Sequence, residues 1–207
     1  MPPKCQTEQE RQQTRMGFIE AARDLFVTRG VEAVTMREVA KSTGYSATAL
    51  YLHFADKNAL LQAVCDTDFL ALAQSLENIM KIIDPIQRLK ALGAAYAHFA
   101  LDHPNQYRLM FMTPSPCFDP QSSSIQQGNL QQDAYAQLKE VVRLAHEADC
   151  FRAGLGGVAM IAQTIWAGVH GVCSLQIALG NDAWIDWRAA EDRLVLMQDV
   201  LIRGLVK

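Results

Sequence analysis

The sequence predicts an all-helical protein with a small N-terminal domain and a larger C-terminal domain. Half of its 207 residues are hydrophobic, which is enough to bury a sizeable core. Apolar residues recur at helical spacing through most of the chain, and no alternating strand pattern is present. Glycines and prolines separate these helical segments, as turns between helices require.

The first helix is expected to end at Gly30 and to cover the elements that follow it. Residues 1–13 are polar, and we expect the start of this stretch to be frayed. The inward face of the helix is expected to carry Phe18, Ile19, Ala22, Leu25 and Phe26.

Three capped helices are predicted from Thr35 onwards, and the first two of them are short. Thr35 can cap the first of them, and Glu38 lies where a capping box requires its carboxylate. Gly44 is expected to end that helix, because glycine accepts the left-handed backbone of a C-terminal turn. Ser46 and Asp56 can cap the second and third helices. Two short helices joined by a tight glycine turn are typical of a helix-turn-helix, whose second helix enters the DNA major groove.

The outward face of the second short helix carries groups that suit DNA. Leu50 and Phe54 are expected to point inward, and this leaves a mainly polar face outside. Hydroxyl, phenol, imidazole and ammonium groups bind phosphate oxygens and base edges. A helical corner that only packs is the alternative interpretation. The outward positions are Ser46, Ala47, Thr48, Tyr51, His53 and Lys57.

These residues resemble the DNA-binding domain of the TetR family of bacterial regulators. The resemblance covers residues 14–61 and rests on the pattern T-M-R-E-V-A-x-x-T-G-Y-S-x-x-x-L-Y-x-H-F-x-x-K-x-x-L. It implies a homodimer with a helix-turn-helix domain at 1–60 and a ligand-binding and dimerisation domain at 61–207. It also implies a transcriptional repressor that binds a palindromic DNA operator and is released by a small-molecule inducer.

The expected DNA contacts fall into two groups. Phosphates are expected to be held by backbone amides at the starts of the two short helices and by Thr35, Ser46, Tyr51 and Lys57. The groove is expected to be faced by Arg37 and Thr48, with Tyr51 or His53. The resemblance supports five of these by motif position, namely Thr35, Arg37, Tyr51, His53 and Lys57. Ala47 and Ala49 offer methyl groups and no hydrogen bond, so direct base readout is expected to be sparse.

Beyond the helix-turn-helix, the apolar periodicity predicts six further helices. Between two of them, residues 113–128 form a loop with three prolines, and a loop of this length is either mobile or functional. The helices are expected at about 56–83, 85–102, 105–112, 130–149, 153–181 and 184–206.

The stretch 153–181 contains no charged residue. Its length would span a membrane, but polar residues recur within it and its ends lack a basic cluster, so we expect no membrane contact. An uncharged helix with small residues is instead expected to be buried in protein. Two such helices from each of two subunits would form a four-helix interface. We therefore expect a homodimer through roughly residues 153–206.

A ligand site is expected among the helices of the larger domain. W-A-G-V-H-G at 166–171 and H-P-N-Q-Y-R-L-M-F at 103–111 resemble a TetR subgroup with a Trp-x-x-x-His-Gly pattern. The central helix lacks Arg and Lys, which favours an apolar or a cationic, aromatic-stacked ligand in an apolar cavity. The alternative is that these residues are ordinary core. The expected lining is Tyr96, Phe99, Tyr107, Met110, Phe111, Gln163, Trp166 and His170.

Charge and cysteine content exclude several other classes. The net charge is −3, distributed as +1 over residues 1–60 and −4 over the rest, which fits a DNA-binding domain on an acidic body. The five cysteines are odd in number and not closely paired, so neither a disulfide framework nor a zinc site is favoured. The polar N-terminus has no apolar signal segment, and a reducing cytoplasm is the expected location.

An enzyme is the main rival function, and the motifs do not support it. The glycines at 154–157 follow no strand, so they are not a dinucleotide fingerprint. The segment at 44–48 lacks the second glycine of a nucleophile elbow. We expect no catalytic residue, metal or cofactor. The alternative function is a helical small-molecule-binding protein, or an enzyme, whose helix-turn-helix is not functional.

Overall fold

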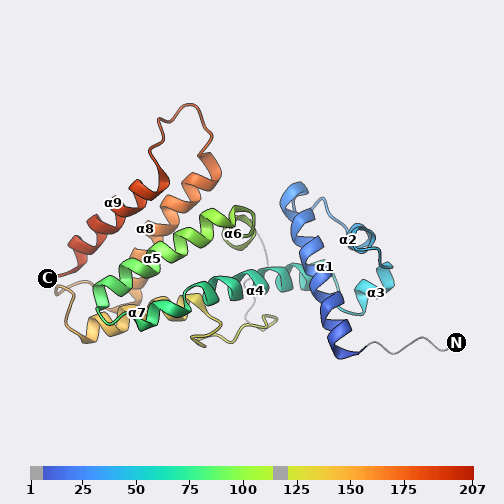
Figure 1. Ribbon diagram of the computed structural model, residues 1–207, viewed down its shortest axis with the longest axis horizontal. Helices are drawn as coiled ribbons and strands as arrows, with labels where there is room; N and C mark the ends of the chain where they lie inside the picture. The colour runs from blue at the N-terminus through green and yellow to red at the C-terminus, as the bar shows by residue number, and fades with distance from the viewer. Residues whose placement is uncertain (1–6, 114–120) are drawn as a thin grey trace. The chain divides into compact units, whose positions relative to one another are not determined.

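The computed structural model describes residues 7–113 and 121–207, which form helices joined by turns (Figure 1). Within these ranges the one β feature is an isolated bridge between Phe151 and Val206. The expected all-helical class is confirmed. The chain divides into a head unit, Met1–Asp68 with Arg108–Ser124, and a body unit, Phe69–Tyr107 with Ile125–Lys207.

The first helix of the head, α1, spans Glu8–Arg29. The Thr7 hydroxyl accepts a hydrogen bond from the Glu10 amide at 3.2 Å, and the Glu10 carboxylate accepts one from the Thr7 amide at 2.8 Å. This capping box starts the helix at Glu8. The fraying expected at the start of the chain concerns the residues before this helix. Residues 1–6 lie outside the described residues. Its apolar face buries Phe18, Ile19, Ala22 and Phe26, and Leu25 is half-buried.

Three helices follow in the head: α2 (Met36–Ser42), α3 (Ala47–Tyr51) and α4 (Lys57–Ser75), the last of which continues into the body. The prediction of one helix from residue 56 to 83 is wrong at its end. The Ser75 hydroxyl donates to the Leu72 carbonyl at 2.7 Å, and such bonds compete with helix continuation. The chain then tightens into the 3-10 helix η1, Glu77–Lys81.

The body begins with α5 (Pro85–Asp102). The Asp84 carboxylate accepts a hydrogen bond from the Gln87 amide at 2.7 Å, and Pro85 occupies the first helical turn, where its missing N–H has no cost. The next helix, α6 (Pro104–Phe111), crosses from the body to the head after Tyr107.

The last three helices are α7 (Ala134–Glu147), α8 (Val158–Leu179) and α9 (Ala190–Leu205). Each begins later than the apolar pattern predicts. The prolines of the 113–128 loop lie outside the described residues, and residues 125–133 form turns that end at the cap of α7.

The late starts of α8 and α9 have local causes. Three glycines before α8, at 154, 156 and 157, have φ between 81° and 90°, which a right-handed helix cannot contain. Before α9, the Asp182 carboxylate accepts a hydrogen bond from the Trp184 amide at 2.9 Å and closes a turn. Trp184 therefore lies in a loop, 96% exposed, and not in the predicted helix.

Within the body, α8 and α9 run side by side (Figure 1). Gly168 makes this close crossing possible, because a Cβ there would lie 2.5 Å from Leu201 Cδ1 and 2.7 Å from Met197 Sδ. In the described part of the chain, α8 is the one helix long and apolar enough to cross a membrane, and core helices of globular proteins meet the same criteria. Only 28% of the most apolar 18-residue stretch of α8 is buried within the subunit.

Candidate nucleic-acid interface and ligand site

The helix-turn-helix is built from two capped helices and a glycine turn, as the sequence predicts. At the start of α2, the Thr35 hydroxyl accepts a hydrogen bond from the Glu38 amide at 3.3 Å, and Glu38 accepts from the Thr35 amide at 2.8 Å. Gly44 has φ 76° in the turn. The Ser46 hydroxyl accepts from the Ala49 amide at 3.1 Å and caps α3. One amide at each helix start is therefore already bonded to its cap.

The capping carboxylate of Glu38 is strongly acidic. The Thr35 hydroxyl and amide donate to it, and the Arg29 guanidinium lies 2.8 Å away. These donors lower the pKa of Glu38 from its ordinary 4.5 to about 2. The carboxylate thus stays charged, and the start of α2 stays capped, in mildly acidic solution.

Replacing Glu38 with Gln is expected to remove an acid-sensitive part of the stability of the head. Because the folded-state pKa of Glu38 is depressed, its contribution is present above about pH 4.5 and disappears as the pH falls towards 2. Thermal melts of wild type and Glu38→Gln should therefore differ most near neutral pH and converge below pH 3. Glu20→Gln, at an exposed position on α1, is the matched control. A constant difference across this pH range would contradict the assignment.

The outer surface of the helix-turn-helix exposes the side chains predicted to read DNA. Arg37 on α2 and Thr48 on α3 are exposed, and Tyr51 at the end of α3 is 52% exposed. Leu50 is buried beneath them and holds α3 to the core. Ala47 is half-buried, so its methyl group remains partly accessible.

Two predicted DNA contacts have partners inside the head. The His53 ring packs 5.6 Å from the Phe18 ring, and burial, followed by the charges of Arg11 and Arg15, lowers the pKa of His53. The Lys57 ammonium donates to the Val31 carbonyl at 3.0 Å. Both groups therefore fix the position of α3 and α4, and their contact with DNA stays a prediction.

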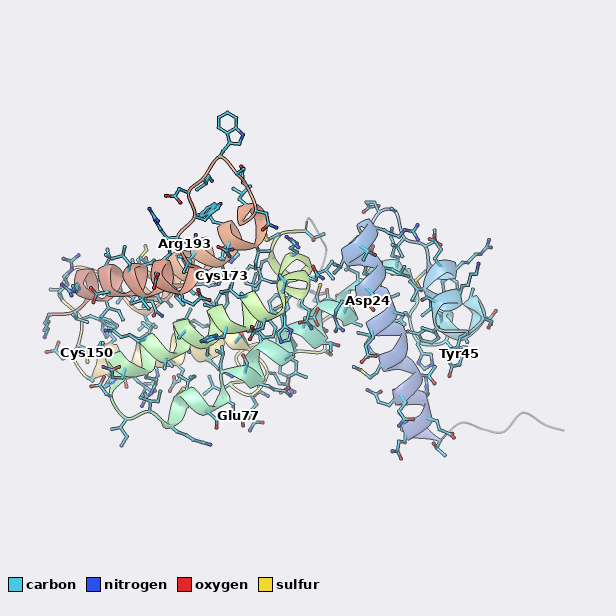
Figure 2. The ribbon with its side chains drawn as sticks, turned by 45° about the horizontal axis from the view of Figure 1, so that its top comes forward. Asp24, Tyr45, Glu77, Cys150, Cys173 and Arg193 are labelled. Carbon is cyan, nitrogen blue, oxygen red and sulfur yellow. The ribbon has the colours of Figure 1, made fainter. Side chains whose placement is uncertain are left out.

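Two exposed residues of this surface were not among the predicted contacts. Tyr45 lies in the turn, 44% exposed, with its ring 5.3 Å from that of Phe18, and Figure 2 labels it at the surface of the head. Leu52, just after α3, is 73% exposed. Leu52 follows directly after Tyr51 in the sequence. Its exposure could have been predicted, because it does not share the inward face that Leu50 and Phe54 form.

In the body, four of the predicted ligand residues form one hydrogen-bonded cluster. The Trp166 indole donates to the Tyr96 hydroxyl at 3.1 Å, and the Tyr96 and Tyr107 hydroxyls lie 3.0 Å apart. The Tyr107 hydroxyl lies 2.5 Å from His170 Nδ1, and the two rings stack. All these contacts are satisfied if Trp166 donates to Tyr96, Tyr96 donates to Tyr107, and Tyr107 donates to Nδ1 of a neutral His170.

Burial keeps this cluster uncharged. It raises the pKa of Tyr96 to about 12, it also raises the pKa of Tyr107, and it lowers the pKa of His170. Tyr107 is fully buried, whereas Trp166 and His170 are half-buried. The buried hydroxyls thus bond to each other, and the rings of Trp166 and His170 on α8 are partly exposed.

The other predicted ligand residues are Gln163, Phe99, Met110 and Phe111. Gln163 is exposed and donates to the Tyr135 hydroxyl at 3.3 Å, and the Tyr135 ring lies 6.0 Å from that of Trp166. Phe99 is buried on α5, with its ring 5.1 Å from that of His103. The remaining two, Met110 and Phe111, belong to the head unit.

Across residues 7–113 and 121–207, no group of three His, Cys, Asp or Glu side chains is placed to share a metal ion. Cys65 and Cys173 are buried and Cys150 is half-buried, whereas Cys5 and Cys117 lie outside the described residues. Burial raises the pKa of the Cys173 thiol to about 11, which keeps it in the unreactive thiol form.

Comparison with known proteins covers both units. Residues 18–64 match the family described as bacterial regulatory proteins, tetR family, and residues 89–196 match the tetracyclin repressor-like C-terminal domain. The chain is 36% identical to the HTH-type transcriptional regulator TtgR of Pseudomonas putida over 91 residues, and this stretch is 42% of each of the two chains. Over 103 residues it is 35% identical to the HTH-type transcriptional activator FasR of Mycolicibacterium smegmatis, 49% of this chain and 47% of the relative. The chain thus covers less than half the length of these curated relatives.

A solved structure from Rhodococcus sp. RHA1, described as a protein of unknown function, has the same fold over its whole length. It superimposes with a TM-score of 0.75, covers 100% of both chains and is 24% identical in sequence. At this identity the similarity shows the fold alone.

Proposed function

The chain belongs to the tetR family of bacterial regulatory proteins, and from this premise we propose that it is a repressor that binds a palindromic operator as a homodimer and is released by a small-molecule inducer. The observation that carries the proposal is the exposed pair of helices α2 and α3, each capped at its start, with Arg37, Thr48 and Tyr51 on their surface. Regulators of this family act on DNA, so the proposed location is the cytoplasm.

The mode of regulation is tested separately from DNA binding. TtgR is named a regulator and FasR an activator, and each is similar to less than half of this chain. A reporter gene behind a promoter that carries an operator, selected by the protein from a randomised DNA library, distinguishes repression from activation. Repression predicts higher reporter output when the regulator gene is deleted, and activation predicts lower output.

The proposed dimer is formed by α8 and α9. The exposed side of α8 is uncharged, and that of α9 includes Val195, Leu196 and Val200. An exposed apolar surface shared by two neighbouring helices is stabilised when it is buried against a second subunit. A two-fold axis through such an interface would present two heads to half-sites one helical turn apart, roughly 34–36 Å. The exposed residues of α8 are Ala159, Met160, Gln163, Thr164, Ala167, Leu175, Ala178 and Leu179.

The proposed ligand is apolar, or cationic and able to stack on aromatic rings. The support is the uncharged cluster of the body, in which Trp166 and His170 are half-buried and Gln163 is exposed beside Tyr135. A neutral set of donors and rings gives a strongly anionic ligand no countercharge. The ligand would thus be oriented by few hydrogen bonds and held mainly by contact with rings.

Replacing Arg37 with Ala is expected to weaken DNA binding by about 1–3 kcal/mol and to relax the base preference at one position of each half-site. The exposed guanidinium of α2 is suited to a bidentate contact with guanine. The probe is a duplex selected by the wild-type protein from a randomised library, and binding is measured by fluorescence anisotropy at several salt concentrations. Arg188→Ala, which removes an exposed guanidinium from the body, is the matched control.

The slope of affinity against salt concentration separates the two roles of Arg37. A loss of slope of about one unit with unchanged base preference would make Arg37 a phosphate contact. Wild-type affinity, slope and preference in Arg37→Ala would exclude it from the interface. If no duplex is selected at all, the proposed function is wrong.

An inducer is expected to lower operator affinity, and operator DNA to lower inducer affinity by the same factor. Coupling between two sites is reciprocal, and factors of about 5 to 150 are usual. A compound found by thermal shift in a neutral and cationic aromatic library can be titrated by tryptophan fluorescence, with and without DNA. Trp166→Phe should remove the ligand-dependent signal, and Trp184→Phe should keep it. Equal ligand affinity of free and DNA-bound protein would refute the release mechanism.

A further inference from the structure

The chain crosses between the head and the body three times. Two crossings lie within helices, after Asp68 in α4 and after Tyr107 in α6. The third crossing follows Ser124, in a segment without helix. Residues 121–124 thus belong to the head, although the chain leads from them through turns directly into α7 of the body.

A buried carboxylate on α4 holds this third crossing. Asp66 is 6% exposed and accepts hydrogen bonds from the Ser123 hydroxyl at 2.9 Å and from the Ser124 amide and hydroxyl at 2.6 and 2.8 Å. It also accepts one from the Gln62 side-chain amide, one helical turn away, at 2.7 Å. A buried carboxylate requires such donors, because its charge has lost contact with water.

The same part of α4 is fastened to the helix that carries the DNA-binding elements. Asp68, two residues further on, accepts two bonds from the Arg23 guanidinium of α1, at 2.7 and 3.2 Å. Positions two apart on a helix lie on nearly opposite sides. The last turn of α4 within the head is therefore held on one side by α1 and on the other by the 123–124 segment.

The chain from Ser124 to α7 contains several hydrogen bonds of its own. The Gln126 amide donates to the Gln132 side chain at 3.0 Å. The Asp133 carboxylate accepts from the Gly128 amide and from the Ala136 amide in the first turn of α7, both at 2.9 Å. These hydrogen bonds order the turns between residue 126 and the start of α7.

We propose that Asp66, Ser123 and Ser124 form a latch through which the state of α7 is transmitted to α4 and α1. Asp66 is a positioning residue here, because it acts on DNA binding through the helices it holds. The inference rests on the proposed DNA-binding function and gives a signal that starts in the body a route to the head. Because coupling is reciprocal, the latch predicts that DNA binding by the head changes how often the backbone hydrogen bonds of α7 open.

Amide hydrogen exchange in α7, measured with and without bound DNA, tests the latch. The full-length protein is saturated with the duplex selected by the wild type, and exchange is followed in peptides covering 134–147. In the wild type, DNA is expected to change the α7 exchange rate by about fivefold or more. In Asp66→Ala, and in Ser123→Ala with Ser124→Ala, this change is expected to disappear while the duplex still binds.

The serine variants remain informative if Asp66→Ala fails to fold, because Ser124 is exposed and Ser123 half-buried. Gln74→Ala, at an exposed position on α4, is the matched control and should keep the wild-type response. A DNA-dependent change of equal size in the wild type and the latch variants would overturn the latch, as would a wild type whose α7 does not respond to bound DNA. A wild type that binds no duplex would overturn the proposed function and this inference with it.

Discussion

Arginine in place of Ala167 is expected to leave a monomer that has lost its affinity for a two-half-site operator. Ala167 lies at the centre of the exposed, uncharged side of α8, which is the proposed dimer interface. A guanidinium buried there in both subunits would lose its hydration without gaining a carboxylate partner, and the cost exceeds that of losing one apolar contact. A monomer also loses the linkage between its two heads, so operator affinity is expected to fall by at least about 100-fold.

Sedimentation velocity at micromolar concentration measures the change in assembly, and anisotropy with the selected duplex measures the change in affinity. Gln87→Arg, on an exposed part of α5, adds the same charge outside α8 and α9 and should stay dimeric. Gly168 is unsuitable for this test, because a side chain there would strike Leu201 and Met197 of the same subunit. A dimeric Ala167→Arg protein with wild-type DNA affinity would place the interface elsewhere.

The helix-turn-helix was predictable because its signals are local. Thr35 and Glu38, three residues apart, form the expected capping box, and Gly44 adopts the expected positive φ. The cap of α3 by Ser46 follows from the same rule. Each of these interactions is decided within one helical turn, so a single sequence contains the information needed to predict it.

The interactions that were not predicted join residues far apart in the chain. Asp66 and Ser124 lie 58 positions apart in sequence, and Arg23 and Asp68 lie 45 apart. Nothing in the local pattern distinguishes these carboxylates from solvated ones. The end of α4 at Ser75 was missed for a related reason, since the apolar periodicity continues through the 3-10 turn that replaces the helix.

The predicted ligand cluster shows an intermediate case. The four-residue spacing of Trp166 and His170 on α8 was a usable signal, because residues at this spacing share a helix face. Their partners Tyr96 and Tyr107 come from α5 and α6, and the sequence could not show that the two hydroxyls bond to each other. Whether this cluster contacts a ligand stays a prediction.

Replacing Arg23 with Met is expected to destabilise the head by about 3 kcal/mol, which corresponds to a fall in melting temperature of about 6–12 °C for a chain of this size. Arg23 approaches Asp68 with two nitrogens, and the Asp68 side chain is fully buried while that of Arg23 is 17% exposed. Removing the Arg23 guanidinium takes two charge-assisted hydrogen bonds away from the buried carboxylate. The partial exposure of Arg23 places the cost at the lower end of the range for buried pairs.

The double variant Arg23→Met with Asp68→Leu separates a true ion pair from simple loss of packing. Exchanging a buried pair for apolar side chains of similar volume removes both the attraction and the desolvation cost, so the double variant is expected to be more stable than Arg23→Met alone. Urea unfolding of the wild type, both single variants and the double variant closes the thermodynamic cycle. Additive losses would mean that the two side chains contribute independently. A loss in the double variant smaller than the sum of the two single losses would show that the charge pair itself joins α1 and α4. In that case Arg23→Met should be at least as unstable as Asp68→Leu, because it leaves a buried carboxylate behind.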